Sequence, residues 1–497
     1  MNIRKHGPQF NNLTSRFSSR DCLGIENVAA SISAEICPIV NTVTPRAFYW
    51  PFLCWIYYDF YKNSGIQKKD VDTFCNQFLK RQDYFFVLAN LLVDNPDQYN
   101  LVGKQKTSLD KARNLEGPFS FNKNYFQNRY GGMQYYNAGC LSMSFIVLDE
   151  EDRHIPKLTQ YGEEMALAFE EVIKGTTYYR QYRLKNIPVP KDVLIEYGHV
   201  INLGLNGFDK CKSLLRRQMF EAVPQISRQL NEDAVFAGLI YKIAGSHSLK
   251  SSEARHILYD YYSPRGNANE CPKEILNTVR GWEIIVGRHY FTAGIEMIWK
   301  YMLNCLSEPL SIEEWIHTVL NRSTFSFPLE DNLETIIADS NYGFNERESV
   351  VENVRRNGTD PVNVESGLRL MLSVYNRFAD RKDLQDASVF LDYGKGRLPG
   401  TGSISINEWS ETVHDFYNLS IGELLAHIMK EYIIQQHIRT CFEKLTRTSQ
   451  SVDGFYFELI DDVYIKNEHI FQVDFQGLRI LQLMQVMKDL DMFDKGI

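Results

Sequence analysis

The segment Asn41–Tyr61, NTVTPRAFYWPFLCWIYYDFY, constrains the fold more than any other part of the chain. Its central part contains no charged residue, and its aromatic side chains fall on every side of a helical wheel. A helix that is apolar all round is normally buried in a protein core. Thr44 and Pro45 suit a helix start, because a threonine hydroxyl can cap a free N–H and proline has none to leave unpaired. The sequence therefore predicts a buried core helix, with a kink at Pro51.

Arg46 is a permanent cation at the start of this predicted helix, and Tyr49 and Trp50 follow it at helical i+3 and i+4 spacing. Two interpretations of this arginine stay open. In the first, it is salt-bridged within the core. In the second, it forms a pocket with the aromatic rings, and such a pocket could hold a nucleic-acid base or a phosphate.

The composition limits the partners that the chain can attract. Its net charge of −8 provides no general basic field for nucleic acid or an anionic membrane, so any contact with DNA requires a local basic patch. The nine cysteines are scattered without a CxxC motif, which favours reduced thiols and a cytoplasmic location over a disulfide framework. The longest apolar run is too short to cross a membrane.

The periodicity predicts a mainly α-helical protein with small β-hairpins. The longest expected helices cover residues 281–306 and 421–445, and residues 454–465 are expected to form a hairpin around Asp461 and Asp462. The proline-bounded linker Ile187–Pro190 is the best candidate for a domain boundary. We therefore expect a helical N-terminal domain at 1–128, a smaller unit at 129–187 and a helical C-terminal domain at 191–497.

Residues 129–173 resemble the C-terminal half of a winged-helix module. A strand-like run is followed by an acidic turn and then by Leu158, Thr159 and Gly162 at the start of an alanine-containing helix. Thr159 is expected to cap that helix, with Glu163 in its first turn. Winged helices commonly bind DNA, but others only pack against protein, and an acidic turn does not favour a wing that lies on phosphate.

Two further stretches offer cations for a nucleic-acid backbone. Residues 176–217 are locally basic, with Arg180 and Arg183 interleaved with tyrosines, a mixture typical of backbone tracking and base stacking. The glycine-rich stretch Asp392–Gly402 carries Lys395 and Arg397 but lacks the spacing of a phosphate-binding P-loop. The alternatives are a solvated helical face for the first stretch and an ordinary surface loop for the second.

Three short segments carry a resemblance to a known group of proteins: NTVTPRAFYWPFLCW, then GGMQYY with LTQYGEEMALAF, and the terminal LRILQLMQVMKDLDMF. Together they resemble uncharacterised, mostly helical bacterial proteins found among phage-defence genes, some of which are similar to DNA glycosylases. The resemblance implies a role in antiviral defence, with modified phage DNA as the partner. If the chain is an enzyme, the resemblance implies a hydrolase of N-glycosyl bonds.

A glycosylase extrudes a nucleotide, stacks its base on aromatic rings and uses a carboxylate or an activated water at the sugar. The candidate catalytic residues are Asn41, Glu35 and Asp59, although each acid has a plain alternative on a helix surface or in a salt bridge. The candidate DNA-binding residues are Arg46, Tyr49, Trp50, Trp55, Arg180, Arg183, Lys395 and Arg397.

Two other classes of function remain open from the sequence. The acidic balance and the lack of catalytic motifs are compatible with a non-catalytic helical scaffold in a multi-protein complex. The aromatic pocket is compatible with an enzyme for a small molecule. No HExxH motif, histidine–cysteine cluster or dinucleotide fingerprint is present, so the sequence predicts neither a metal nor a cofactor.

Overall fold

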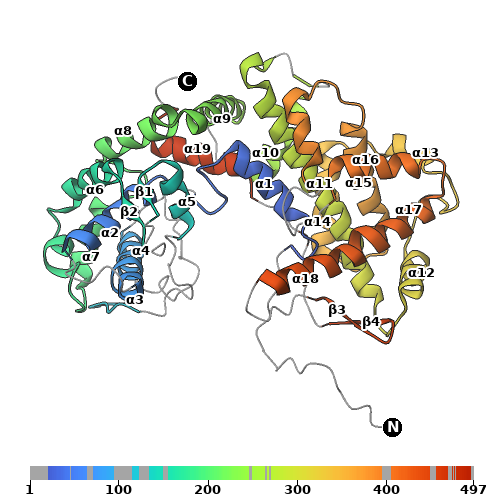
Figure 1. Cartoon of the computed structure of the whole chain (residues 1–497), viewed down its shortest axis with the longest axis horizontal. Helices are drawn as coiled ribbons and strands as arrows, with labels where there is room; N and C mark the ends of the chain where they lie inside the picture. Colours follow the sequence, from blue (N-terminus) through green and yellow to red (C-terminus); the bar gives the residue numbers. More distant parts are fainter. Residues whose placement is uncertain are drawn as a thin grey trace, which may run out of the picture. The chain divides into compact units, whose positions relative to one another are not determined.

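A computed structural model describes residues 21–44, 46–63, 71–93, 115–122, 134–148, 155–245, 249–263, 266–267, 270–394, 404–447, 455–467, 473, 475 and 477–493. Over these residues the protein is mainly α-helical with two small antiparallel sheets, each of two strands, as the sequence predicts (Figure 1). The predicted domain ranges stay predictions.

The contacts within the chain define two compact units. Unit 1 takes its described residues from Met1–Ile32, Leu258–Ser263 and Arg280–Gln476. Unit 2 takes its described residues from Ser33–Ile257, Pro264–Val279 and Gly477–Ile497. Each unit therefore combines segments that are far apart in the sequence.

Unit 2 is built from helices and one short strand pair, and η denotes its 3-10 or π-helical segments. Its elements are α2 (Tyr49–Asn63), α3 (Val71–Thr73), η1 (Phe74–Leu79), α4 (Lys80–Leu92), α5 (Gln134–Ser142), β1 (Ile146–Val147), β2 (Lys157–Leu158), α6 (Gln160–Ile173), η6 (Tyr178–Tyr182), α7 (Lys191–Val200), α8 (Asp209–Arg217), η7 (Gln218–Ala222), α9 (Pro224–Ile243), α10 (Ser251–His256), η10 (Lys273–Ile275) and α19 (Arg479–Asp489).

Helix α2 lies at the centre of unit 2, as its all-round apolar surface predicts. Phe48, just before the helix, stacks on Phe86 of α4 with ring centroids 4.7 Å apart and meets Phe169 of α6 edge-on at 5.4 Å. Phe208 closes the same group at 5.9 Å from Phe48. Because these rings come from four separate segments, their burial fixes α4, α6 and the start of α8 around α2.

Helix α2 begins later than the sequence suggests. Thr44 belongs to a turn, where its N–H donates to the carbonyl of Asn41 at 3.2 Å and its hydroxyl accepts from the Asn41 N–H at 2.8 Å. The helix starts at Tyr49. Pro51 consequently lies in the first turn, where backbone N–H groups have no partner within the helix. Proline at this position removes no hydrogen bond within the helix, so the reason given for a kink at Pro51 does not apply, and the kink itself stays a prediction.

The strand pair and α6 agree with part of the predicted pattern for residues 129–173. Strands β1 and β2 pair antiparallel, with Ile146 opposite Leu158. Thr159 caps α6, as expected, because its hydroxyl accepts from the Gly162 N–H at 3.1 Å. A side chain at Gly162 has no room, since a Cβ atom would lie 2.0 Å from the Phe145 carbonyl oxygen. The winged-helix resemblance itself stays a prediction, and the acidic turn lies outside the described residues.

Unit 1 contains most of the remaining helices and the second strand pair. It takes in most of α1 (Glu26–Ile36), η8 (Ile257–Tyr261) and α11 (Leu276–Cys305), whose other residues belong to unit 2. Its further elements are α12 (Ile312–Arg322), α13 (Glu334–Ile337), η11 (Ala338–Ser340), α14 (Phe344–Arg356), α15 (Asn363–Phe378), η12 (Gln385–Asp392), α16 (Ile406–Asp415), α17 (Ile421–His427), η13 (Ile428–Gln435), α18 (Gln436–Arg447), β3 (Phe457–Ile460) and β4 (Val463–Lys466).

Helix α11 forms the core of unit 1, and it begins a few residues before the range that the sequence predicts. It meets α15 at a pair of glycines, where a Cβ atom on Gly294 would lie 2.7 Å from the Gly367 carbonyl oxygen, and one on Gly367 would lie 2.5 Å from the Gly294 carbonyl oxygen. The two backbones are therefore in direct contact. His289 on α11 is 5 % exposed and is therefore a core residue of unit 1.

The predicted hairpin is confirmed as β3 and β4, with Ile460 opposite Val463. Its turn residues, Asp461 and Asp462, have φ angles of 50° and 65°. Two residues with positive φ are what a tight type I′ turn requires, and aspartate tolerates this conformation better than most residues.

In the part of the chain that the structure describes, no helix combines enough length with enough apolar character to cross a lipid bilayer.

Candidate functional site

The three aromatic candidates on α2 are all core residues. Tyr49, Trp50 and Trp55 each have a relative exposure of 0 %. Tyr49 stacks on Tyr136 of α5 at 4.7 Å, and Trp50 meets the same ring edge-on at 5.7 Å. Trp55 stacks on Phe52 at 5.8 Å. In this structure, the rings of the central segment therefore pack against protein.

Arg46 is also buried, at 1 % exposure, and its guanidinium pairs with Asp489 of α19. The Nη2 atom lies 2.9 Å from Asp489 Oδ1, and Nε donates to Oδ2 at 3.0 Å. Two parallel hydrogen bonds of this kind are the strongest geometry for an arginine and a carboxylate. Of the two interpretations of Arg46 that the sequence left open, the structure has the first, in which the arginine is salt-bridged within the core.

Asn41 and Glu35 occupy the approach to α2. The Asn41 side chain shapes its own turn, because its oxygen accepts from the Val43 N–H at 2.9 Å, and its Nδ2 donates to the Tyr135 carbonyl at 3.0 Å. Glu35 lies in the last turn of α1 and is exposed. The amide of Asn41 thus has a structural task that is independent of any substrate.

Two of the predicted residues that lie 124 positions apart in the sequence do meet. Asp59 near the end of α2 accepts from Arg183, which follows η6, with Nε and Oδ1 3.2 Å apart. The side chain of Asp59 is 2 % exposed and that of Arg183 is 14 % exposed. The carboxylate is therefore buried behind an arginine whose side chain is partly exposed.

Tyr179 and Glu170 complete this contact, and we name the four residues Asp59, Glu170, Tyr179 and Arg183 the Arg183 cluster. The Arg183 guanidinium lies over the Tyr179 ring, 3.8 Å from its centroid, and also donates to the Tyr179 carbonyl. The Tyr179 hydroxyl donates to Glu170 Oε1 at 2.5 Å. Burial, and then the hydrogen bond to Glu170, raises the pKa of Tyr179, so its hydroxyl stays a donor at neutral pH.

One candidate on α2 touches the edge of the Arg183 cluster. The Trp55 and Tyr179 rings lie 6.3 Å apart at an angle of 38°. Residues proposed separately as catalytic and as DNA-binding (Asp59, Trp55 and Arg183) are thus joined through Tyr179.

The sequence did not identify the residues that hold the backbone around Arg183 in place. Arg81 of α4 donates to the carbonyls of Tyr182, Arg183 and Lys185. Its neighbour Gln82 accepts from the Tyr178 hydroxyl at 2.8 Å and donates to the Arg183 carbonyl at 3.0 Å. Arg81 is 3 % exposed and Gln82 is 2 % exposed. The signal available in the sequence was the polar run Lys80–Asp83, which directly precedes the apolar run 84–89 of α4.

The remaining cationic candidates are on the surface or outside the described residues. Arg180 is exposed, and its Nε donates to the Thr176 carbonyl at 3.4 Å. Lys185, a further cation of the basic stretch 176–217, is exposed as well. Lys395 and Arg397 lie outside the residues that the structure describes.

Within the described ranges, no group of three or more histidine, cysteine, aspartate or glutamate side chains is placed to hold a metal ion. The chemistry that the Arg183 cluster itself offers is a buried carboxylate, a guanidinium that partly covers it, and an aromatic ring against that guanidinium. A carboxylate in such a place can stabilise positive charge, and the guanidinium can bind an anion at the surface.

Compared with known proteins, the chain matches no protein-family model, no curated protein and no solved structure.

Proposed function

We propose that this protein acts on DNA, with the Arg183 cluster as the place where it meets the sugar–phosphate backbone. The contact between Arg183 and the buried Asp59 carboxylate, with Tyr179 stacked on the guanidinium, is the observation that supports this. In the excision of a base, a cation can bind the phosphate, an aromatic ring can stack on the extruded base and a carboxylate can stabilise positive charge at the sugar.

Each group has a distinct task in this proposal. The exposed Arg180 and Lys185 supply local positive charge in a chain whose net charge is negative, and this charge attracts phosphate. Arg183 binds the backbone next to the reacting nucleotide. The Asp59 carboxylate then stabilises the positive charge that develops on the sugar as the N-glycosyl bond breaks. This step requires Arg183 to turn away from Asp59, because it covers the carboxylate in this structure.

The modified base and the role in phage defence rest on the resemblance of three short segments to phage-defence proteins. Ordinary and modified DNA must therefore be compared in the test. The purified protein is incubated with each DNA, retention is measured by fluorescence anisotropy, and abasic sites are detected as breaks after alkali treatment.

Three variants separate binding from excision. Asp59→Asn should keep DNA binding and lose abasic sites, because it removes the charge and keeps the shape. Arg180→Ala and Arg183→Lys should weaken retention. The matched control is Glu171→Gln on α6, whose side chain is 71 % exposed and forms an ion pair with the nearby Lys174. It should behave as the wild type.

A helical scaffold is the second candidate, and a specific observation favours it. Arg46, Tyr49, Trp50 and Trp55 all have buried partners in the core, so the central segment supports the fold. If the folded wild-type protein neither retains nor cleaves ordinary or modified DNA, the DNA proposal is wrong and the scaffold becomes the leading function. Retention without abasic sites in any DNA would reject excision alone.

A further inference from the structure

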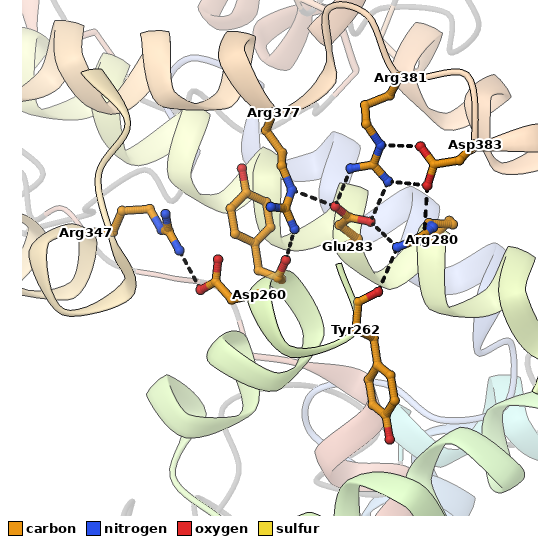
Figure 2. A network of polar contacts seen from close by, with 9 residues as sticks. Asp260, Tyr262, Arg280, Glu283, Arg347, Arg377, Arg381 and Asp383 are labelled. Atoms are coloured by element: carbon orange, nitrogen blue, oxygen red, sulfur yellow. Dashed lines mark hydrogen bonds and ion pairs between the residues drawn. The ribbon is translucent and has the colours of Figure 1, made fainter. Parts of the chain in front are cut away.

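Unit 1 contains a cluster of arginines that converge on one buried carboxylate (Figure 2). Glu283 of α11 is 1 % exposed. It receives Arg280 from its own helix, Arg377 from the last turn of α15, and Arg381 from the loop that follows. We name these four residues together with Asp383 the Glu283 cluster.

The inner carboxylate is fully engaged. Glu283 Oε1 accepts from Arg377 Nε at 2.7 Å and from Arg381 Nη1 at 2.9 Å. Its Oε2 accepts from Arg280 Nη1 at 3.0 Å and from Arg381 Nη2 at 3.3 Å. The Tyr262 carbonyl also accepts from Arg280 Nη1 at 2.9 Å. These hydrogen bonds to the buried Glu283 carboxylate and the Tyr262 carbonyl fix the orientation of the guanidinium groups.

The outer side of the same guanidinium groups holds a second carboxylate. Asp383 accepts from Arg381 through Nε and through Nη2, the latter at 2.8 Å, and lies 3.1 Å from Arg280 Nη2. Its side chain is 39 % exposed, whereas that of Arg280 is 3 % exposed and that of Arg381 is 15 % exposed. Asp383 thus occupies the solvent side of a site whose donors are already in place.

The charges in the Glu283 cluster do not balance. Three guanidinium groups face two carboxylates, which leaves one positive charge in excess. The adjoining Arg347 pairs with Asp260 at 2.6 Å and adds no net charge. A more highly charged anion in the place of Asp383 would therefore be better matched to its surroundings.

We propose that the outer position of the Glu283 cluster is an exchangeable anion site for a phosphate monoester, and that Asp383 is its internal occupant. Arg381 presents two parallel N–H donors, and Arg280 Nη2 presents a third from a neighbouring direction. A carboxylate has two oxygens for these three donors, whereas a terminal phosphate offers three and carries more charge. Glu283 holds the donors in the same geometry whether Asp383 is present or displaced.

The tethered carboxylate competes with any free ligand. A group on a short loop acts at an effective concentration on the order of millimolar or above, so phosphate binding to the wild type should be weak. Removal of Asp383 should expose the site without disturbing the inner carboxylate. This inference concerns unit 1 and does not depend on the proposed function of the Arg183 cluster.

The test compares Asp383→Ala with Asp380→Ala in the full chain. Asp380 is an exposed acid in the same loop, so its removal changes the net charge equally and leaves the site occupied. Phosphate binding is followed by ³¹P NMR titration with inorganic phosphate, and circular dichroism confirms that each variant is folded. Asp383→Ala should bind about tenfold or more tightly than Asp380→Ala and the wild type.

A second comparison identifies the donors and the source of the phosphate. Arg381→Lys in the Asp383→Ala background should lose the gain, because lysine cannot present two parallel donors. A 5′-phosphorylated oligonucleotide is compared with the same oligonucleotide ending in a hydroxyl. Tighter binding of the phosphorylated form indicates a nucleic-acid end, whereas binding of inorganic phosphate alone indicates a small ligand. Equal binding by Asp383→Ala and Asp380→Ala, or a gain that survives Arg381→Lys, would overturn the proposal.

Discussion

Arg46 and Asp489 are 443 positions apart in the sequence, and their side chains form a buried, doubly hydrogen-bonded ion pair in unit 2. Asp489 Oδ2 also accepts from the Ala47 N–H at 3.0 Å, and its Oδ1 accepts from Gln485 Nε2 at 3.1 Å. One carboxylate therefore fastens α19 to the residues just before α2.

Removal of this carboxylate should destabilise the protein strongly. Asp489→Ala leaves the Arg46 guanidinium buried without its counter-charge, and we expect a loss of about 3–5 kcal/mol in the free energy of unfolding. The control is Glu171→Ala, which removes one member of an ion pair whose side chains are 53 % and 71 % exposed. It should cost less than about 1 kcal/mol in the same urea titration. Similar costs for both variants would contradict the prediction.

The same carboxylate should make stability depend on pH. Burial raises the pKa of Asp489 to about 6, although the charge of Arg46 and the hydrogen bonds from Ala47 and Arg46 lower it. The unfolded value is about 3.9, so the folded state binds the proton more tightly. The resulting stability is present below pH ~4 and is lost as the pH rises through ~6.

Asp489→Asn cannot titrate and provides the reference for that measurement. The free energy of unfolding of the wild type, minus that of Asp489→Asn, should fall by about 2–3 kcal/mol between pH 4 and pH 7. An NMR titration of the Asp489 carboxyl carbon gives its pKa directly. A constant difference in stability, together with a pKa near 4, would show that pairing with Arg46 outweighs burial.

Gly162 should be intolerant of any side chain. A Cβ atom there would lie 2.0 Å from the Phe145 carbonyl oxygen and 2.8 Å from Leu158 Cδ2, so α6 would have to move away from β1 and β2. We expect Gly162→Ala to cost about 1–3 kcal/mol or more. Gly175→Ala is the matched control, because nothing lies within 4 Å of its Cβ position. Thermal unfolding of the two variants should separate them clearly, with Gly175→Ala at or slightly above the wild type.

Glu283 should contribute much more to stability than an exposed glutamate with similar partners. In Glu283→Gln, three guanidinium groups lose the buried negative charge between them, and we expect a loss of about 3–5 kcal/mol. Glu352→Gln is the control, because Glu352 also pairs with two arginines but its side chain is 45 % exposed. It should change the free energy of unfolding by less than about 1 kcal/mol. Equal effects in a denaturant titration would show that burial of Glu283 has no energetic importance.

Local sequence features were sufficient for the helical class and for several details. The Thr159 cap and the Asp461–Asp462 turn were correctly predicted, because each depends on the backbone preferences of residues close in the chain. The burial of α2 was also predictable, because a helix with aromatic residues on every side has no face to present to water.

Partners that are remote in the sequence were not predictable. From the sequence, Asp59 was a candidate catalytic residue and Arg183 a candidate DNA-binding residue, and nothing indicated that the two are in contact. The sequence also contained no indication that Asp489 pairs with Arg46, or that Arg81 binds the backbone carbonyls of residues 182, 183 and 185. A charged side chain is surface-exposed, buried in a pair or part of a binding site according to which distant segment packs against it.

The sequence by itself thus determined the mainly helical class, the central position of the aromatic helix and the local caps and turns. Only the tertiary structure decided that Arg46 is a core residue, that Arg183 covers Asp59 and that three arginines surround Glu283. The physical reason is range: hydrophobic periodicity and capping act over a few residues, whereas an ion pair forms only where packing brings its two members together.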